Sequence, residues 1–83
     1  MKIPRKGSLV LVRWDDAVNH GPRPVAVHNA PDTCILETVG WITRRTRRSL
    51  FVAPERGPDF GDGRFRWTMR LPLGMIREIV RIA

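Results

Sequence analysis

The sequence predicts an all-β domain built from five short strands, and three observations support this. Residues 64–71 read Arg-Phe-Arg-Trp-Thr-Met-Arg-Leu, a strict alternation of polar and apolar side chains typical of a strand with one buried face. Two further runs are short and rich in β-branched and apolar residues. Seven glycines and seven prolines among 83 residues supply turns between such runs.

The first strand is predicted over residues 8–14, Ser-Leu-Val-Leu-Val-Arg-Trp, which Asp15 and Asp16 bring to an end. Residues 15–31 follow without a sustained period of 2 or 3.6 and contain one glycine, three prolines and both histidines. We therefore expect a long loop, and loops of this length in small domains are often functional.

A second strand is predicted over residues 35–43, where Gly40 marks a bulge or bend, and a third over residues 49–53, closed by Pro54. The five residues between them, Arg-Arg-Thr-Arg-Arg, are too few for anything but a hairpin tip. Residues 55–63 contain three glycines and a proline and are expected to form a flexible loop.

In the fourth strand, residues 64–71, the alternation predicts a core face and a solvent face. The core face would carry Phe65, Trp67, Met69 and Leu71, and the solvent face Arg64, Arg66, Thr68 and Arg70. The segment 72–74, Pro-Leu-Gly, then breaks the strand. Residues 75–82 are rich in isoleucine and valine and favour a last strand, with a short helix as the alternative.

This layout predicts a small five-stranded SH3-like barrel with a long first loop, as one domain over residues 1–83. Barrel closure removes exposed strand edges and lets the thin core of a chain this short suffice. An OB-type barrel is the competing fold, but it normally has a helix between its third and fourth strands, and no segment here supplies one.

The composition of the chain bears on where in the cell the protein is expected. No apolar run approaches the roughly 20 residues that cross a bilayer, and the amino-terminal residues lack the apolar core of a signal peptide. The single cysteine, Cys34, cannot form a disulfide within the chain, which fits a reducing compartment. We therefore expect a cytoplasmic protein without a membrane partner.

Positive charge is the strongest functional signal. The chain carries a formal net charge of +7, and all but two of its 15 basic residues are arginine, whose planar guanidinium suits phosphate and carboxylate. Crowding of guanidiniums in the hairpin and along one strand favours an anionic partner, whereas a merely solvated basic surface is the simpler alternative. The candidate binding residues are Arg44, Arg45, Arg47 and Arg48 in the hairpin and Arg64, Arg66 and Arg70 in the fourth strand.

The three tryptophans offer stacking surfaces for bases, although core packing is the commoner role for a tryptophan in a strand. Trp67 is placed on the core face by its alternation, whereas Trp14 and Trp41 adjoin a loop or a glycine and are the candidates for stacking.

Catalytic and metal sites are not predicted. The candidate residues lack the spacing of a metal motif or a nucleophile–base pair, and the sequence contains no phosphate-binding loop. These candidates are Asp15, Asp16, His20, His28 and Cys34. The sequence thus predicts a non-enzymatic protein without a cofactor or metal.

Four short motifs carry a resemblance to a group of small phage-encoded proteins. They are Trp-Asp-Asp-Ala at 14–17, Thr-Val-Gly-Trp-Ile at 38–42, Leu-Phe-Val-Ala-Pro at 50–54 and Leu-Pro-Leu-Gly-Met-Ile at 71–76. The resemblance implies a β-barrel fold and a phage or prophage origin, hence the cytoplasm of a bacterial host, but no biochemical activity. The hairpin of such relatives is typically acidic or mixed, so the basic tip is not implied by the resemblance.

Two binding hypotheses follow. In the first, the arginines contact the phosphates of DNA or RNA, or another phosphate-bearing anion. In the second, the protein is an interaction module that inhibits a host enzyme or defence complex, with the arginines in an acidic groove and the 15–31 loop and Phe60 as further contacts. Self-association through Phe60 or the last strand is a third possibility.

Overall fold

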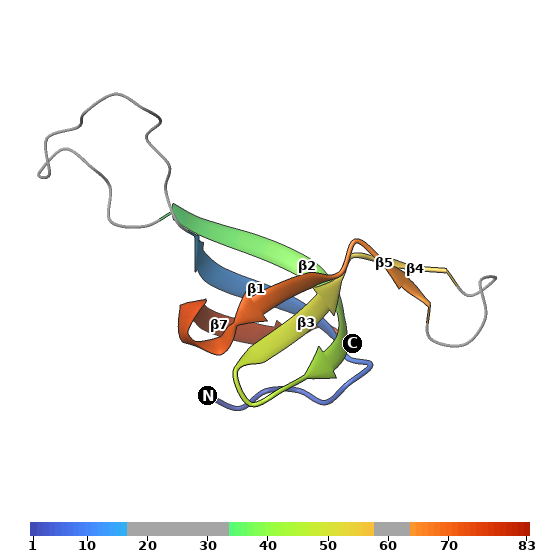
Figure 1. Cartoon of the computed structure of the whole chain (residues 1–83), viewed down its shortest axis with the longest axis horizontal. Helices are drawn as coiled ribbons and strands as arrows, with labels where there is room; N and C mark the ends of the chain where they lie inside the picture. The colour runs from blue at the N-terminus through green and yellow to red at the C-terminus, as the bar shows by residue number, and fades with distance from the viewer. Residues whose placement is uncertain (17–33, 58–63) are drawn as a thin grey trace, which may run out of the picture.

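The computed structural model describes residues 1–16, 34–57 and 64–83, and within them the fold is all-β (Figure 1). A five-stranded antiparallel sheet is accompanied by a two-stranded hairpin, which extends from the sheet at the right of Figure 1. The five strands of the large sheet are β1 (Leu9–Asp16), β2 (Cys34–Arg45), β3 (Ser49–Ala53), β6 (Met69–Pro72) and β7 (Ile76–Arg81). The hairpin consists of β4 (Glu55–Arg56) and β5 (Phe65–Arg66), and a 3₁₀ turn, η3 (Leu73–Met75), joins β6 to β7.

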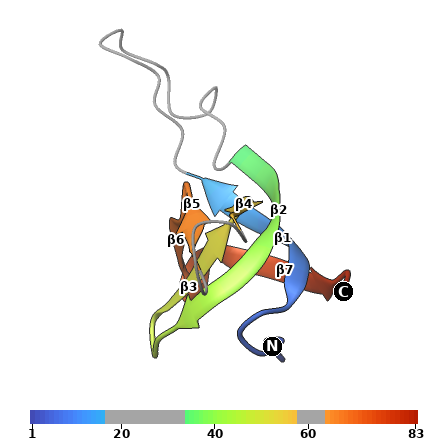
Figure 2. The ribbon, with the colours of Figure 1, turned by 90° about the vertical axis from the view of Figure 1, so that its right-hand side faces the viewer.

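The strand order of the large sheet, β6-β3-β2-β1-β7, requires the sheet to curl. Its two edge strands, β6 and β7, are consecutive in the chain and are linked only by the three residues of η3. In a flat sheet these edges would lie four strand spacings apart, about 19 Å. The four residue steps from Pro72 to Ile76 rise only about 8 Å in a 3₁₀ conformation, so the edges must approach each other. Figures 1 and 2 show the resulting bend.

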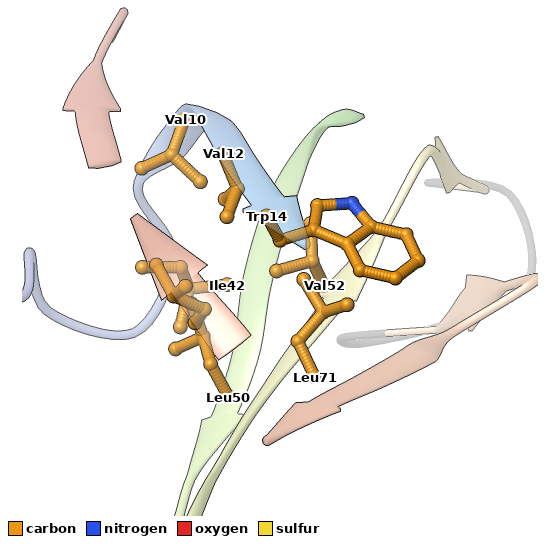
Figure 3. Close-up of a cluster of buried hydrophobic side chains, with 8 residues drawn as sticks. Val10, Val12, Trp14, Ile42, Leu50, Val52 and Leu71 are labelled. Carbon is orange, nitrogen blue, oxygen red and sulfur yellow. The ribbon is translucent and has the colours of Figure 1, made fainter. Parts of the chain in front are cut away.

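The core fills the inside of this curl (Figure 3). Val10, Val12 and Trp14 alternate along β1 and point toward the buried side chains of β2, β3 and β6. The indole Nε1 of Trp14 donates a hydrogen bond to Thr38 Oγ1 at 3.0 Å, which satisfies its only donor away from solvent. The buried apolar cluster comprises Val10, Val12, Trp14, Ile42, Leu50, Val52, Leu71 and Ile76.

Gly40 lets β2 and β3 approach closely. A Cβ at this position would lie 2.5 Å from the carbonyl oxygen of Ala53 and 2.7 Å from Cγ1 of Val52. The prediction of a bulge or bend at Gly40 is wrong, because this residue lies in regular register opposite Val10. The irregularity of β2 lies between Ile42 and Arg44. The glycine serves close packing instead.

The prediction for residues 64–71 is wrong in one respect, because they do not form one continuous strand. Residues 65–66 pair with β4 and residues 69–72 pair with β3, so the alternating segment serves two different sheets. Trp67 lies between them with a left-handed φ of 63° and is 76% exposed, so it is not a core residue. Met69 is also exposed, and of the predicted core face only Leu71 is buried. A change of partner strand overrides the alternation.

The other boundaries differ by a few residues. β1 continues through Asp15 and Asp16, which pair with Ile35 and Cys34, and β4 lies at the start of the predicted 55–63 loop. The last segment is a strand preceded by a 3₁₀ turn and not a helix. Residues 17–31 of the predicted first loop, and Phe60, lie outside the described residues. Within the described ranges, no helix is long and apolar enough to span a membrane.

Candidate functional site

A row of three residues crosses the outer face of β2, β3 and β6. Arg44 pairs with Phe51, and Phe51 pairs with Arg70. Cross-strand partners place their side chains on the same face of a sheet, so the ring of Phe51 lies between two arginines. Leu50 and Val52, which alternate with Phe51, are fully buried on the opposite face.

A β-bulge creates this row. From Trp41 and Ile42 the regular register with β3 would bring Thr43 opposite Phe51, but the register shifts between Ile42 and Arg44. Thr43 becomes the extra residue, and its Oγ1 donates to the carbonyl oxygen of Phe51 at 3.5 Å. Bulges commonly re-aim a side chain in this way. Here the bulge brings Arg44 over the Phe51 ring, with Cζ 5.3 Å from the ring centroid, within the range of a cation–π interaction.

A second stack of an arginine on an aromatic ring lies further along the same face. Arg56 places its Cζ 4.9 Å from the centroid of the Trp41 ring. The half-buried Trp41 contributes to an open cavity of about 440 Å³, which is lined by Trp41, Pro54, Glu55, Arg56, Gly57 and Arg66. Across the β4–β5 hairpin, the Nε of Arg66 bonds Glu55 Oε2 at 2.9 Å, which holds one guanidinium at the cavity.

The two stacks belong to one surface. Trp41 pairs with Ala53, and Ala53 and Phe51 are two residues apart in β3, so both rings project from the outer side of the β2–β3 pair. We call this surface the arginine–aromatic face. It comprises Trp41, Arg44, Phe51, Arg56, Arg66 and Arg70.

The hairpin tip next to this face is a compact turn with exposed arginines. The Oγ1 of Thr46 accepts hydrogen bonds from the backbone N–H of Ser49 at 3.0 Å and of Arg48 at 3.4 Å. Arg45, Arg47 and Arg48 are all exposed. Arg45 pairs with the inward-facing Leu50, so its side chain leaves β2 on the side opposite Arg44. The four hairpin arginines therefore do not all point the same way.

The structure thus brings together part of the predicted binding set. Arg44 and Arg70 flank Phe51, and Arg66 lies at the cavity beside Trp41. Arg64 is exposed at the end of the β4–β5 hairpin, where its carbonyl oxygen accepts the N–H of Gly57 at 3.1 Å.

One predicted stacking residue is unavailable. Trp14 is only 8% exposed, and its ring packs in the core, so the partial exposure expected for it is not found and its ring offers no open face to a base. Its neighbours on β1 alternate between inside and outside, and this alternation places Trp14 inward with Val10 and Val12. Trp41 lies on the other side of the sheet and retains partial exposure.

Sequence reasoning missed two members of the face, Phe51 and Arg56. The alternation of 49–53 could have revealed Phe51, because Leu50 and Val52 on either side of it are stronger candidates for the core. Arg56 had no such signal. It lay in a predicted loop, and only the β4–β5 hairpin brings it over Trp41.

Of the residues considered for catalysis, the structure describes Asp15, Asp16 and Cys34, and among these Asp16 and Cys34 are cross-strand partners. The Nε of Arg77 donates to both carboxylate oxygens of Asp15, to Oδ1 at 2.7 Å and to Oδ2 at 2.9 Å. Cys34 is exposed at the start of β2. In residues 1–16, 34–57 and 64–83, no three histidine, cysteine or acidic side chains are placed to hold a metal ion. His20 and His28 lie outside these ranges.

Comparison with known proteins identifies no relative: no family model, no curated protein and no solved structure matches this chain.

Proposed function

We propose that this protein is a non-enzymatic nucleic-acid-binding domain whose arginine–aromatic face contacts a single strand. The observation that carries the proposal is the pair of rings, Trp41 and Phe51, on one face of β2–β3, each with a guanidinium over it and with Arg70 alongside. Aromatic rings stack on unpaired bases of any sequence, and arginines contact the phosphates between them.

The chemistry favours unpaired over duplex nucleic acid. Phosphate contacts alone serve a duplex as well as a single strand, but a ring on a sheet surface reaches a base face only where the base is unstacked. The hairpin-tip arginines Arg45, Arg47 and Arg48 extend the positive field beyond the face and add sequence-independent affinity.

The proposal includes an SH3-like barrel of phage origin. The strand order β6-β3-β2-β1-β7 and the 3₁₀ turn before the last strand support the barrel. The phage origin rests on the four sequence motifs alone.

A matched pair of double variants tests the proposal. Arg44→Gln/Arg70→Gln removes two guanidiniums from the arginine–aromatic face. Arg13→Gln/Arg77→Gln removes two from β1 and β7, where they pair with Glu37 and Asp15. Both variants lower the net charge equally. Binding of labelled single-stranded DNA, duplex DNA and RNA would be measured by fluorescence anisotropy over a salt series.

We expect the Arg44/Arg70 variant to reduce the slope of log K against log salt by about 1.4 on a single strand, for two lost phosphate contacts. The Arg13/Arg77 variant should leave the slope unchanged. Trp41→Phe retains all charges, so a loss of about tenfold in affinity would isolate stacking from electrostatics. Equal losses in the two double variants would refute this face as the binding site.

Absence of binding at low salt would refute the nucleic-acid proposal altogether. The remaining hypothesis would then be the second one from the sequence, in which the arginines bind an acidic groove of another protein. That hypothesis would be tested by comparing how well the wild type and a charge-reversed hairpin variant capture an acidic host protein. The variant is Arg44→Glu/Arg45→Glu/Arg47→Glu/Arg48→Glu.

A further inference from the structure

A second surface, on the outer side of β2, β1 and β7, is apolar. Val39 of β2 pairs with Leu11 of β1, and Leu11 pairs with Val80 of β7, so three apolar side chains lie in one row across the sheet. Leu9 lies two residues before Leu11, and its carbonyl oxygen accepts the N–H of Ile82 at 2.7 Å. We call Leu9, Leu11, Val39, Val80 and Ile82 the apolar face.

These side chains are unusually open for their type. Val39 is 50% exposed, Val80 45% and Ile82 53%, and Leu9 and Leu11 between them are half-buried. Single exposed apolar residues are ordinary, but adjoining rows of them on one sheet face indicate a surface that is covered by something.

On one side of the apolar face, acidic and basic side chains nearly cancel each other. The next row across the same strands is Glu37, Arg13 and Glu78, in which Arg13 lies 3.3 Å from one carboxylate and 3.9 Å from the other. Beyond it Arg77 is paired with Asp15. Two arginines and three carboxylates give this border a net charge of −1, whereas the whole chain carries +7.

We propose that the apolar face is a homodimer interface, occupied by a second copy of this chain. Two copies of a protein with a charge of +7 repel each other wherever their arginine-rich surfaces meet. The five side chains of the apolar face carry no charge, and the row of Glu37, Arg13 and Glu78 on one side of it carries none of that excess, whereas Arg56 lies over Trp41 at the other end. Two copies that meet on the uncharged side chains therefore avoid most of the repulsion between their arginine-rich surfaces. A two-fold axis brings the same patch of both copies together, and the alternating signs of the Glu37, Arg13 and Glu78 row let opposite charges become neighbours.

The same features argue against other occupants. The carboxylates of Glu37 and Glu78 repel a nucleic-acid backbone, and an anionic membrane would be attracted to the basic surfaces instead. The apolar face adjoins the arginine–aromatic face, because Leu9 pairs with Trp41. The two faces share no residue, so dimerisation and nucleic-acid binding are tested by different variants.

The experiment is sedimentation equilibrium of the nuclease-treated full chain at low salt and in high sodium chloride. We expect the mass to rise with concentration from 9.5 kDa toward twice that value. The rise should persist in high salt, because the contact is apolar and its border is balanced. A mass that stays at 9.5 kDa up to millimolar protein would overturn the proposal.

Two variants with the same added charge locate the contact. Val39→Lys/Val80→Lys places two ammonium groups on the apolar face and should leave a monomer. Trp67→Lys/Met69→Lys adds the same charge at two exposed apolar positions between β5 and β6 and should still dimerise. If both variants dimerise, or both become monomeric, the apolar face is not the interface.

Circular dichroism would report whether each variant folds. If Val39→Lys/Val80→Lys fails to fold, dimerisation would be measured for the nearly isosteric Val39→Thr/Val80→Thr variant instead. Threonine suits a strand and replaces one methyl group of each valine with a hydroxyl. A weaker dimer in this variant supports the proposal, and an unchanged dissociation constant overturns it.

Discussion

Among glycine-to-alanine substitutions at the described glycines, Gly40→Ala should destabilise the protein most. Gly40 is buried in β2, opposite Val10. The added Cβ would lie 2.5 Å from the carbonyl oxygen of Ala53, 2.7 Å from Cγ1 of Val52 and 2.8 Å from the carbonyl carbon of Ala53. Two of these three atoms are backbone, so a side-chain rotation cannot relieve the contact.

The cost is set by how far β3 can move. Overpacking of a well-packed core costs typically 1–3 kcal/mol, and we expect about 3 kcal/mol here because a strand has to shift. For a domain of this size each kcal/mol lowers the melting temperature by roughly 4–8 °C, so the expected decrease is about 12–24 °C. The shift would also disturb the Trp41–Ala53 pair on which the arginine–aromatic face depends.

Thermal unfolding followed by circular dichroism measures this effect, with Gly74→Ala as the matched control. No atom lies within 4 Å of a Cβ at Gly74, so alanine there should be neutral or stabilising by about 0.4–1 kcal/mol, through the lower entropy of the unfolded chain. A Gly40→Ala protein that melts within a few degrees of the wild type would refute the close-approach argument.

Three further substitutions probe the core, the hairpin and the surface. Leu71→Ala removes a fully buried side chain of the edge strand β6 and should cost about 2–5 kcal/mol in urea denaturation, so an effect below 1 kcal/mol would contradict the assigned core. Thr46→Val deletes the hydroxyl that accepts the N–H of Ser49, and a loss of about 1 kcal/mol is expected, together with faster hydrogen exchange at that amide. Arg77→Gln breaks an ion pair with Asp15 whose arginine side chain is 54% exposed, and the change in unfolding free energy should stay below about 1 kcal/mol; a larger value would mean that the pair is structural.

Local sequence determined much of the fold and the chemical nature of the surface. Strand β3 lies at the predicted residues 49–53, because a short apolar run between a hairpin tip and a proline has few alternatives. The ends of β1, β2 and β7 were predicted to within two residues, but the bulge of β2 was not predicted at its actual position. The exposure of the arginines also followed from their charge, since an unpaired guanidinium is costly to bury.

Tertiary structure decided which residues meet. The alternation of 64–71 predicted one strand, but pairing with two partners splits it at Trp67 and leaves this tryptophan outside, while Trp14 packs inside. The bulge at Thr43 moves Arg44 beside Phe51, and the β4–β5 hairpin lays Arg56 on Trp41. The sequence by itself therefore determined the β class, most strand positions and a basic surface, because these depend on the properties of neighbouring residues. Register and partner choice depend on contacts between distant segments, and only the folded chain placed the rings and arginines on one face.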